Sequence, residues 1–112
     1  KKQTFKVLKN QISRGLKGIK KKNNILIAYE PIWSVGTGII PKIFDLDRKI
    51  KYLKNFLIKK IKIKNPKVLY GGSVNHKNIT YLKKIDILDG FLIGGASHSP
   101  KKFIDIIKKT FI

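Results

Sequence analysis

The run ILIAY at residues 25–29 is short, wholly apolar and ends at the acidic residue Glu30. A run of this length and composition is typical of a strand that is buried on both faces, as in a parallel sheet. Residues 30–41, which follow, contain two prolines and two glycines, so they predict a long loop without regular structure. The sequence therefore predicts a buried strand whose carboxyl end opens into an irregular loop.

Helical and strand-like segments alternate on both sides of this run. Apolar residues spaced by three and four predict helices at residues 4–19, 43–61 and 77–85, and short apolar runs predict strands at 67–70 and 89–93. A last helix is expected to begin at Ser99-Pro100, where serine can cap and proline needs no N–H partner. Its expected buried face consists of Phe103, Ile104, Ile106 and Ile107. This alternation favours parallel strands joined by crossover helices.

The chain length limits how much of such a fold can form. A closed barrel of eight β/α units takes about 250 residues, about 31 for each unit, so 112 residues supply about three and a half units. We therefore predict that residues 1–112 are one segment of a single α/β barrel domain, with three parallel strands, four helices and no second domain. Without the rest of the barrel, Ile25, Ile27, Val68 and Leu92 are expected to meet water.

The composition restricts the possible compartments and partners. The chain lacks cysteine, which fits a reducing, cytoplasmic compartment, and it has no apolar run near the roughly 18 residues of a membrane span. It also lacks methionine, so it is either processed or part of a longer protein. The net charge is +20, but nearly all basic residues are lysine and isoleucine is abundant, a bias that AT-rich coding produces.

Nucleic-acid binding is an alternative function that this charge raises. The lysines concerned are Lys20, Lys21, Lys22, Lys59, Lys60, Lys62 and Lys64. No nucleic-acid motif or series of aromatic residues accompanies them, which disfavours nucleic acid as a partner.

All three predicted strands end in loops that contain glycine, at residues 30–38, 71–74 and 94–97. Functional sites of β/α folds gather at the carboxyl ends of the strands. Glycines there allow backbone N–H groups to approach a phosphate, although close packing is another reason for glycine. Glu30 is the only glutamate, and partial desolvation at a strand end would suit a general base. A solvated loop carboxylate is the other interpretation.

The loop sequences also resemble a known family. Residues 28–38 (AYEPIWSVGTG), 70–74 (YGGSV) and 89–97 (DGFLIGGAS) are similar to three motifs of the triosephosphate isomerases, in that family's order and near its spacing. The resemblance runs from the fifth barrel helix to the last. It implies an enzyme of glycolysis and gluconeogenesis that interconverts dihydroxyacetone phosphate and glyceraldehyde 3-phosphate through an enediolate. It also implies a homodimer of complete barrels, with neither a metal nor an organic cofactor.

The resemblance assigns a role to several residues. Glu30 matches the base that moves the proton between two carbons, a role already known for that family. Pro31, Ile32 and Trp33 match the first hinge of a lid over the substrate. The substrate phosphate is assigned to the backbone at Gly36, Ser73, Gly94 and Gly95. The hydroxyls of Tyr70 and Ser73 match groups that hold the lid closed.

Two departures from the family pattern bear on activity. Residues 39–41, which match the second hinge of that lid, are Ile-Ile-Pro where the family usually has Lys-Thr-Ala, and Pro41 lacks an N–H, which predicts impaired lid closure. The family's Asn, Lys and electrophilic His lie in the first half of the barrel, and His76 and His98, both expected to be exposed, do not match that His. We therefore expect no turnover from these 112 residues without the missing amino-terminal half. An inactive remnant is the alternative within the same ancestry.

Overall fold

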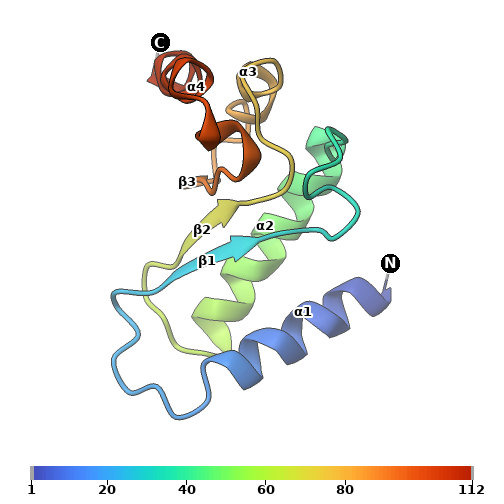
Figure 1. Ribbon diagram of the computed structural model, residues 1–112. Helices are drawn as coiled ribbons and strands as arrows, with labels where there is room; N and C mark the ends of the chain where they lie inside the picture. The colour runs from blue at the N-terminus through green and yellow to red at the C-terminus, as the bar shows by residue number, and fades with distance from the viewer. Residues whose placement is uncertain (1, 112) are drawn as a thin grey trace.

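Three parallel strands form the centre of the fold in the computed structural model, which describes residues 2–111 (Figure 1). They are β1 (Leu26–Tyr29), β2 (Lys67–Tyr70) and β3 (Gly90–Phe91), in the order β1-β2-β3. Tyr29 pairs with Tyr70, and Tyr70 pairs with Phe91. Because all pairs are parallel, the three carboxyl ends lie at one edge of the sheet.

Helices connect and flank these strands. They are α1 (Lys2–Gly15) before β1, α2 (Ile43–Lys59) between β1 and β2, α3 (Ile79–Leu82) between β2 and β3, and the 3-10 helix η1 (Gly95–His98) followed by α4 (Pro100–Phe111). Within the described residues this is an open three-stranded sheet with four α-helices, as expected for part of a β/α barrel.

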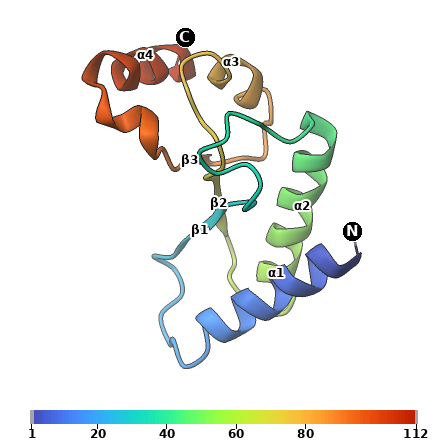
Figure 2. The same ribbon diagram turned by 45° about the vertical axis from the view of Figure 1, so that its right-hand side comes forward.

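The core lies between α2 and one face of the sheet. The buried residues of α2 recur every three or four positions and belong to one cluster with the strand residues of the same face; they are Leu46, Ile50, Leu53, Phe56 and Leu57. Val68 and Tyr70 of β2 are fully buried in that cluster. Helix α1 packs against α2, where the rings of Phe5 and Tyr52 lie 4.4 Å apart. Both helices lie on the same side of the strands (Figure 2).

Helices α3 and α4 pack against each other beyond β3 (Figures 1 and 2). Ile79, Leu82 and Ile106 are buried there. The expected cap of the last helix is confirmed, because the hydroxyl of Ser99 accepts a hydrogen bond from the N–H of Lys102 at 3.3 Å.

Several elements are shorter than the sequence predicts. Strand β2 has the predicted bounds, but β3 has only two residues and α3 only four. Helix α1 ends at Gly15 instead of residue 19, and Gly18 follows in the left-handed region with φ of 82°.

The predicted exposure of the strands is partly wrong. Val68 is fully buried, because its side chain faces α2 and not the open side. Leu92 is 47% exposed, as predicted, whereas Ile25 and Ile27 are only half-buried. Leu26 is 64% exposed, so β1 is not buried on both faces. One face of the sheet is covered by helices, and the other lacks the opposing strands of a closed barrel.

The predicted buried face of the last helix is also partly wrong. Ile106 is buried and Phe103 half-buried, but Ile104 and Ile107 are 50% and 41% exposed. Helix α4 contacts α3 on one side, so the rest of its apolar surface is uncovered within the described residues.

Candidate active site

Glu30 lies at the carboxyl end of β1, directly beside the end of β2. The N–H of Gly71 donates a hydrogen bond to the carbonyl of Tyr29 at 2.8 Å, which joins the two strand ends. A Cβ added to Gly71 would lie 2.7 Å from Cγ of Glu30, so the glutamate side chain crosses the backbone of this glycine. The side chain of Glu30 is exposed, so these residues do not provide the expected partial desolvation.

Two cavities adjoin Glu30, and both lie on its α1 side. One, of about 500 Å³, is lined by α1 residues and by residues 25–30 along β1. The other, of about 370 Å³, lies between α1 and Pro31, Ile32 and Trp33. The exposed edge of β1 therefore borders an apolar groove, in the position where a further strand would pair.

Residues 31–41, which we call the lid loop, fold into consecutive turns. Pro31 is buried, and its carbonyl accepts hydrogen bonds from Ser34 and Val35 N–H at 2.9 and 3.3 Å. Gly36 and Gly38 adopt φ of 71° and 79°, a region that favours glycine. Four apolar side chains of this loop are exposed, Ile32 by 92% and Trp33, Val35 and Ile39 by about half. The lid loop thus has a defined backbone and an apolar outer surface.

Hydrogen bonds join the lid loop to the end of β2. The N–H of Gly38 donates to Oγ of Ser73 at 3.0 Å, and the N–H of Ser73 donates to Oγ of Ser34 at 3.1 Å. Oη of Tyr70 lies 2.7 Å from Oγ of Ser34. The structure therefore brings Tyr70, Ser73 and the lid loop together. Sequence reasoning missed Ser34, because one serine in a loop carries no signal of its partners.

Burial is the largest influence on the pKa values of the two tyrosines at the strand ends, Tyr29 and Tyr70. Burial, followed by the proximity of Tyr70, raises the pKa of Tyr29 to about 12. Burial also raises the pKa of Tyr70, although hydrogen bonds with Ser34 and with the backbone of Ser73 oppose the shift. Tyr70 is therefore protonated at neutral pH, and its hydroxyl can act as a donor.

The glycines of the other two loops have different surroundings. A Cβ added to Gly72 would lie 2.1 Å from Oη of Tyr70 and 2.6 Å from Oγ of Ser34, so close packing explains that glycine. A Cβ at Gly94 or Gly95 would meet no atom within 4 Å, and packing explains neither. These two residues begin the turn of η1, where Ser97 N–H donates to the carbonyl of Gly94 at 2.9 Å. The space beside these two α-carbons is therefore free of protein atoms.

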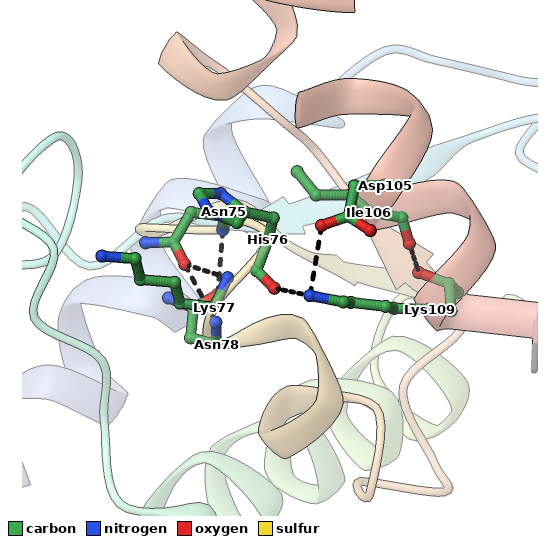
Figure 3. Close-up of polar contacts among 8 residues, drawn as sticks. Asn75, His76, Lys77, Asn78, Asp105, Ile106 and Lys109 are labelled. Carbon is green, nitrogen blue, oxygen red and sulfur yellow. Dashed lines mark hydrogen bonds and ion pairs between the residues drawn. The ribbon is translucent and has the colours of Figure 1, made fainter. Parts of the chain in front are cut away.

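The two histidines differ in their surroundings. His98 is exposed as predicted, but His76 is half-buried, so that prediction is wrong for His76. Figure 3 shows His76 in the turn before α3, where its carbonyl accepts a hydrogen bond from Nζ of Lys109 at 2.9 Å. Lys109 also pairs with Asp105 at 3.1 Å. Packing against α4 therefore covers part of His76, whose Nδ1 is buried without a hydrogen-bond partner in the described structure.

The lysine-rich loops lie before the strands, away from Glu30. Five lysines and two asparagines from these loops line one cavity of about 560 Å³; they are Lys20, Lys21, Lys22, Asn23, Lys62, Lys64 and Asn65. No aromatic residue is among the lining residues. No helix within residues 2–111 is long and apolar enough to cross a membrane.

Comparison with known proteins gives one consistent match. The family model described as triosephosphate isomerase matches residues 1–110. A triosephosphate isomerase of Thermodesulfovibrio yellowstonii is 38% identical over 109 residues, covering 95% of this chain and 44% of that protein. One from Mycoplasma mobile is 42% identical over 102 residues, covering 91% of this chain and 40% of that protein.

A yeast relative, the triosephosphate isomerase of Zygosaccharomyces bailii, is 41% identical over 108 residues, covering 93% of this chain and 43% of that protein. The chain spans less than half the length of the curated relatives it matches. The family model nevertheless covers nearly every residue, including the three strand-end loops. The chain therefore belongs to the triosephosphate isomerase family.

Proposed function

We propose that this chain forms the carboxyl-terminal segment of a triosephosphate isomerase, which interconverts dihydroxyacetone phosphate and glyceraldehyde 3-phosphate. The observation that carries the proposal is the hydrogen bond from Gly38 N–H to Oγ of Ser73, which holds the lid loop at the same sheet edge as Glu30. Family membership supports the assignment of the substrate, a small phosphorylated triose.

Each part of the proposed site has a separate task. Glu30 takes a proton from the carbon beside the substrate carbonyl and returns it to the neighbouring carbon. The backbone at Gly36, Ser73, Gly94 and Gly95 holds the phosphate. Pro31, Ile32 and Trp33 form the hinge of the lid, and Tyr70 with Ser73 holds the lid closed. The proposal includes no metal or organic cofactor.

The amino-terminal half of the barrel is the proposed partner of this segment. The exposed edge of β1, with Leu26 64% exposed, supports pairing with a further strand within a single barrel domain. That half would supply the groups that polarise the substrate carbonyl. Without them, the carbon beside the carbonyl is too weakly acidic for Glu30 to remove its proton. A homodimer in the cytoplasm is proposed for the complete protein. Nucleic acid and membrane are not proposed as partners.

The test is to combine this chain with the missing half. Residues 1–112 are mixed with the amino-terminal half of the Mycoplasma mobile relative. We call the resulting complex the assembled protein. The chain alone should not isomerise its substrate above the rate in free solution, whereas the assembled protein should. Glu30→Gln in the assembled protein should lower kcat by about a hundredfold or more, with a much smaller change in KM.

A matched carboxylate serves as the control. Asp86→Asn removes one exposed carboxylate near the amino end of β3 and should leave kcat unchanged. Turnover by the chain alone, or full activity of Glu30→Gln, would contradict the proposal. An assembled protein that folds but has no activity would favour the inactive remnant.

A further inference from the structure

Apart from tyrosines, Ser34 is the one buried polar or charged residue among residues 3–111, whose burial the structure describes, and it has no exposed surface. It lies in the middle of the lid loop, between exposed Trp33 and half-exposed Val35. A buried hydroxyl is costly unless its hydrogen bonds are satisfied. The position of Ser34 therefore depends on its partners.

The hydroxyl of Ser34 uses all of its hydrogen-bonding capacity. A serine hydroxyl has one donor and two acceptor positions. Oγ of Ser34 donates to the carbonyl of Ile39 at 2.5 Å and accepts the N–H of Ser73 at 3.1 Å. Oη of Tyr70, at 2.7 Å, must therefore be the donor in the third contact. One oxygen atom thus joins the lid loop to two residues at the end of β2.

These contacts fix the far end of the lid loop as well as its middle. Ile39 belongs to the second hinge, where Pro41 has no N–H to offer. The carbonyl of Ile39 attaches that hinge to Ser34 instead. Gly72 leaves room for this arrangement, because a Cβ there would lie 2.6 Å from Oγ of Ser34.

We propose that Ser34 is a positioning residue of the isomerase, whose hydroxyl holds the lid loop and its Pro41 hinge against Tyr70 and Ser73. Its effect on turnover rests on the proposed function, but the attachment of the loop does not. Removing this hydroxyl takes away the acceptor that the Ser73 N–H and the Tyr70 hydroxyl share, so the Ser73 backbone keeps only its contact with Tyr70, and it releases the carbonyl of Ile39. The lid loop then loses its buried link to the strand end.

The first measurement is amide hydrogen exchange in the assembled protein. Ser34→Ala should make the amides of Ser73 and Gly38 exchange about tenfold faster or more, while amides within α2 keep their rates. Thr37→Ala is the matched control, because the Thr37 hydroxyl bonds only within the lid loop, to Trp33, Ser34 and Ile39. It should change the exchange of Ser73 less than twofold. A Ser73 amide without protection in the parent, or unchanged in Ser34→Ala, would overturn the attachment.

The second measurement is a kinetic cycle. Ser34→Ala should lower kcat about tenfold with little change in KM, and Tyr70→Phe should do the same. The double variant should be less than twofold slower than either single variant, because both remove the same link. Independent, multiplicative effects would overturn the proposal.

The two measurements separate this inference from the proposed function. Faster exchange in Ser34→Ala, in an assembled protein that has no isomerase activity, would support the attachment and refute the isomerase function. An active assembled protein in which Ser34→Ala keeps its full kcat would overturn the role of Ser34 and leave the isomerase function standing.

Discussion

At the scale of single residues, glycine has two different uses at the strand ends. Gly71 and Gly72 allow close approach, since a side chain at either would collide with Glu30 or with Tyr70 and Ser34. Gly94 and Gly95 have no neighbour that a side chain would meet. Space beside the α-carbon is therefore free only at the second pair, so a Cβ can be added there without a clash and the substitution tests the proposed phosphate site.

Gly95→Val should weaken the binding of 2-phosphoglycolate to the assembled protein by more than tenfold, about 1.4 kcal/mol or more. The valine side chain would block the approach of the phosphate to the backbone, and its Cβ would meet no protein atom within 4 Å. Isothermal titration calorimetry measures the change. Reversing the charges of Lys20, Lys21 and Lys22, which lie before β1, should hardly affect the affinity. The reverse pattern would show that the phosphate site is not at the strand ends.

At the scale of elements, a carboxylate fixes the shortest strand. Asp89, just before β3, accepts hydrogen bonds from the N–H of Val68 at 2.8 Å and from Nζ of Lys54 at 2.9 Å. Lys54 also donates to the carbonyl of Ile87. Burial alone would raise the pKa of Asp89, but the hydrogen bonds of Lys54 and Val68 and the charges of Lys54 and Lys67 hold it below its usual range. Asp89 thus ties the start of β3 to β2 and α2.

The lowered pKa predicts a stability that depends on pH. The contribution of ionised Asp89 is fully present above the pKa of an unfolded aspartate, about 3.9, and is lost as the pH falls through the lower pKa of the folded protein. Asp89→Asn should lower the free energy of unfolding of the assembled protein at pH 7, and its curve should fall less steeply below about pH 4. Urea unfolding at several pH values measures both. Parallel pH curves for Asp89→Asn and the parent would contradict this, and Asp86→Asn is the control.

At the scale of the whole molecule, the sheet has one covered face and one incomplete face. Helices α1 and α2 cover the side on which Val68 and Tyr70 lie, while Leu26 and Leu92 are largely exposed. The outer edge of β1 has no strand beside it in the described structure. Unpaired parallel edges and uncovered apolar side chains promote association with other chains.

We expect the isolated 112-residue chain to be aggregation-prone or molten, and the assembled protein to unfold cooperatively. The charge of +20 opposes association at low salt, so aggregation should increase when salt screens the lysines. Differential scanning calorimetry and light scattering at low and moderate salt measure both effects. A sharp unfolding transition together with a dispersed NMR spectrum of the monomeric chain would contradict the expectation.

The sequence by itself determined the order of the elements, the bounds of β2 and the cap at Ser99, because these depend on local apolar spacing and local hydrogen bonds. It also determined the family, since three long motifs occur in register. The tertiary structure decided that Val68 is buried, that Ile104 and Ile107 are exposed, and that Glu30 crosses the backbone of Gly71. It also decided two of the three partners of Ser34, Tyr70 and Ser73, which lie 36 and 39 positions away along the chain. Such contacts depend on which segments face each other in space, and a local sequence pattern does not specify those segments.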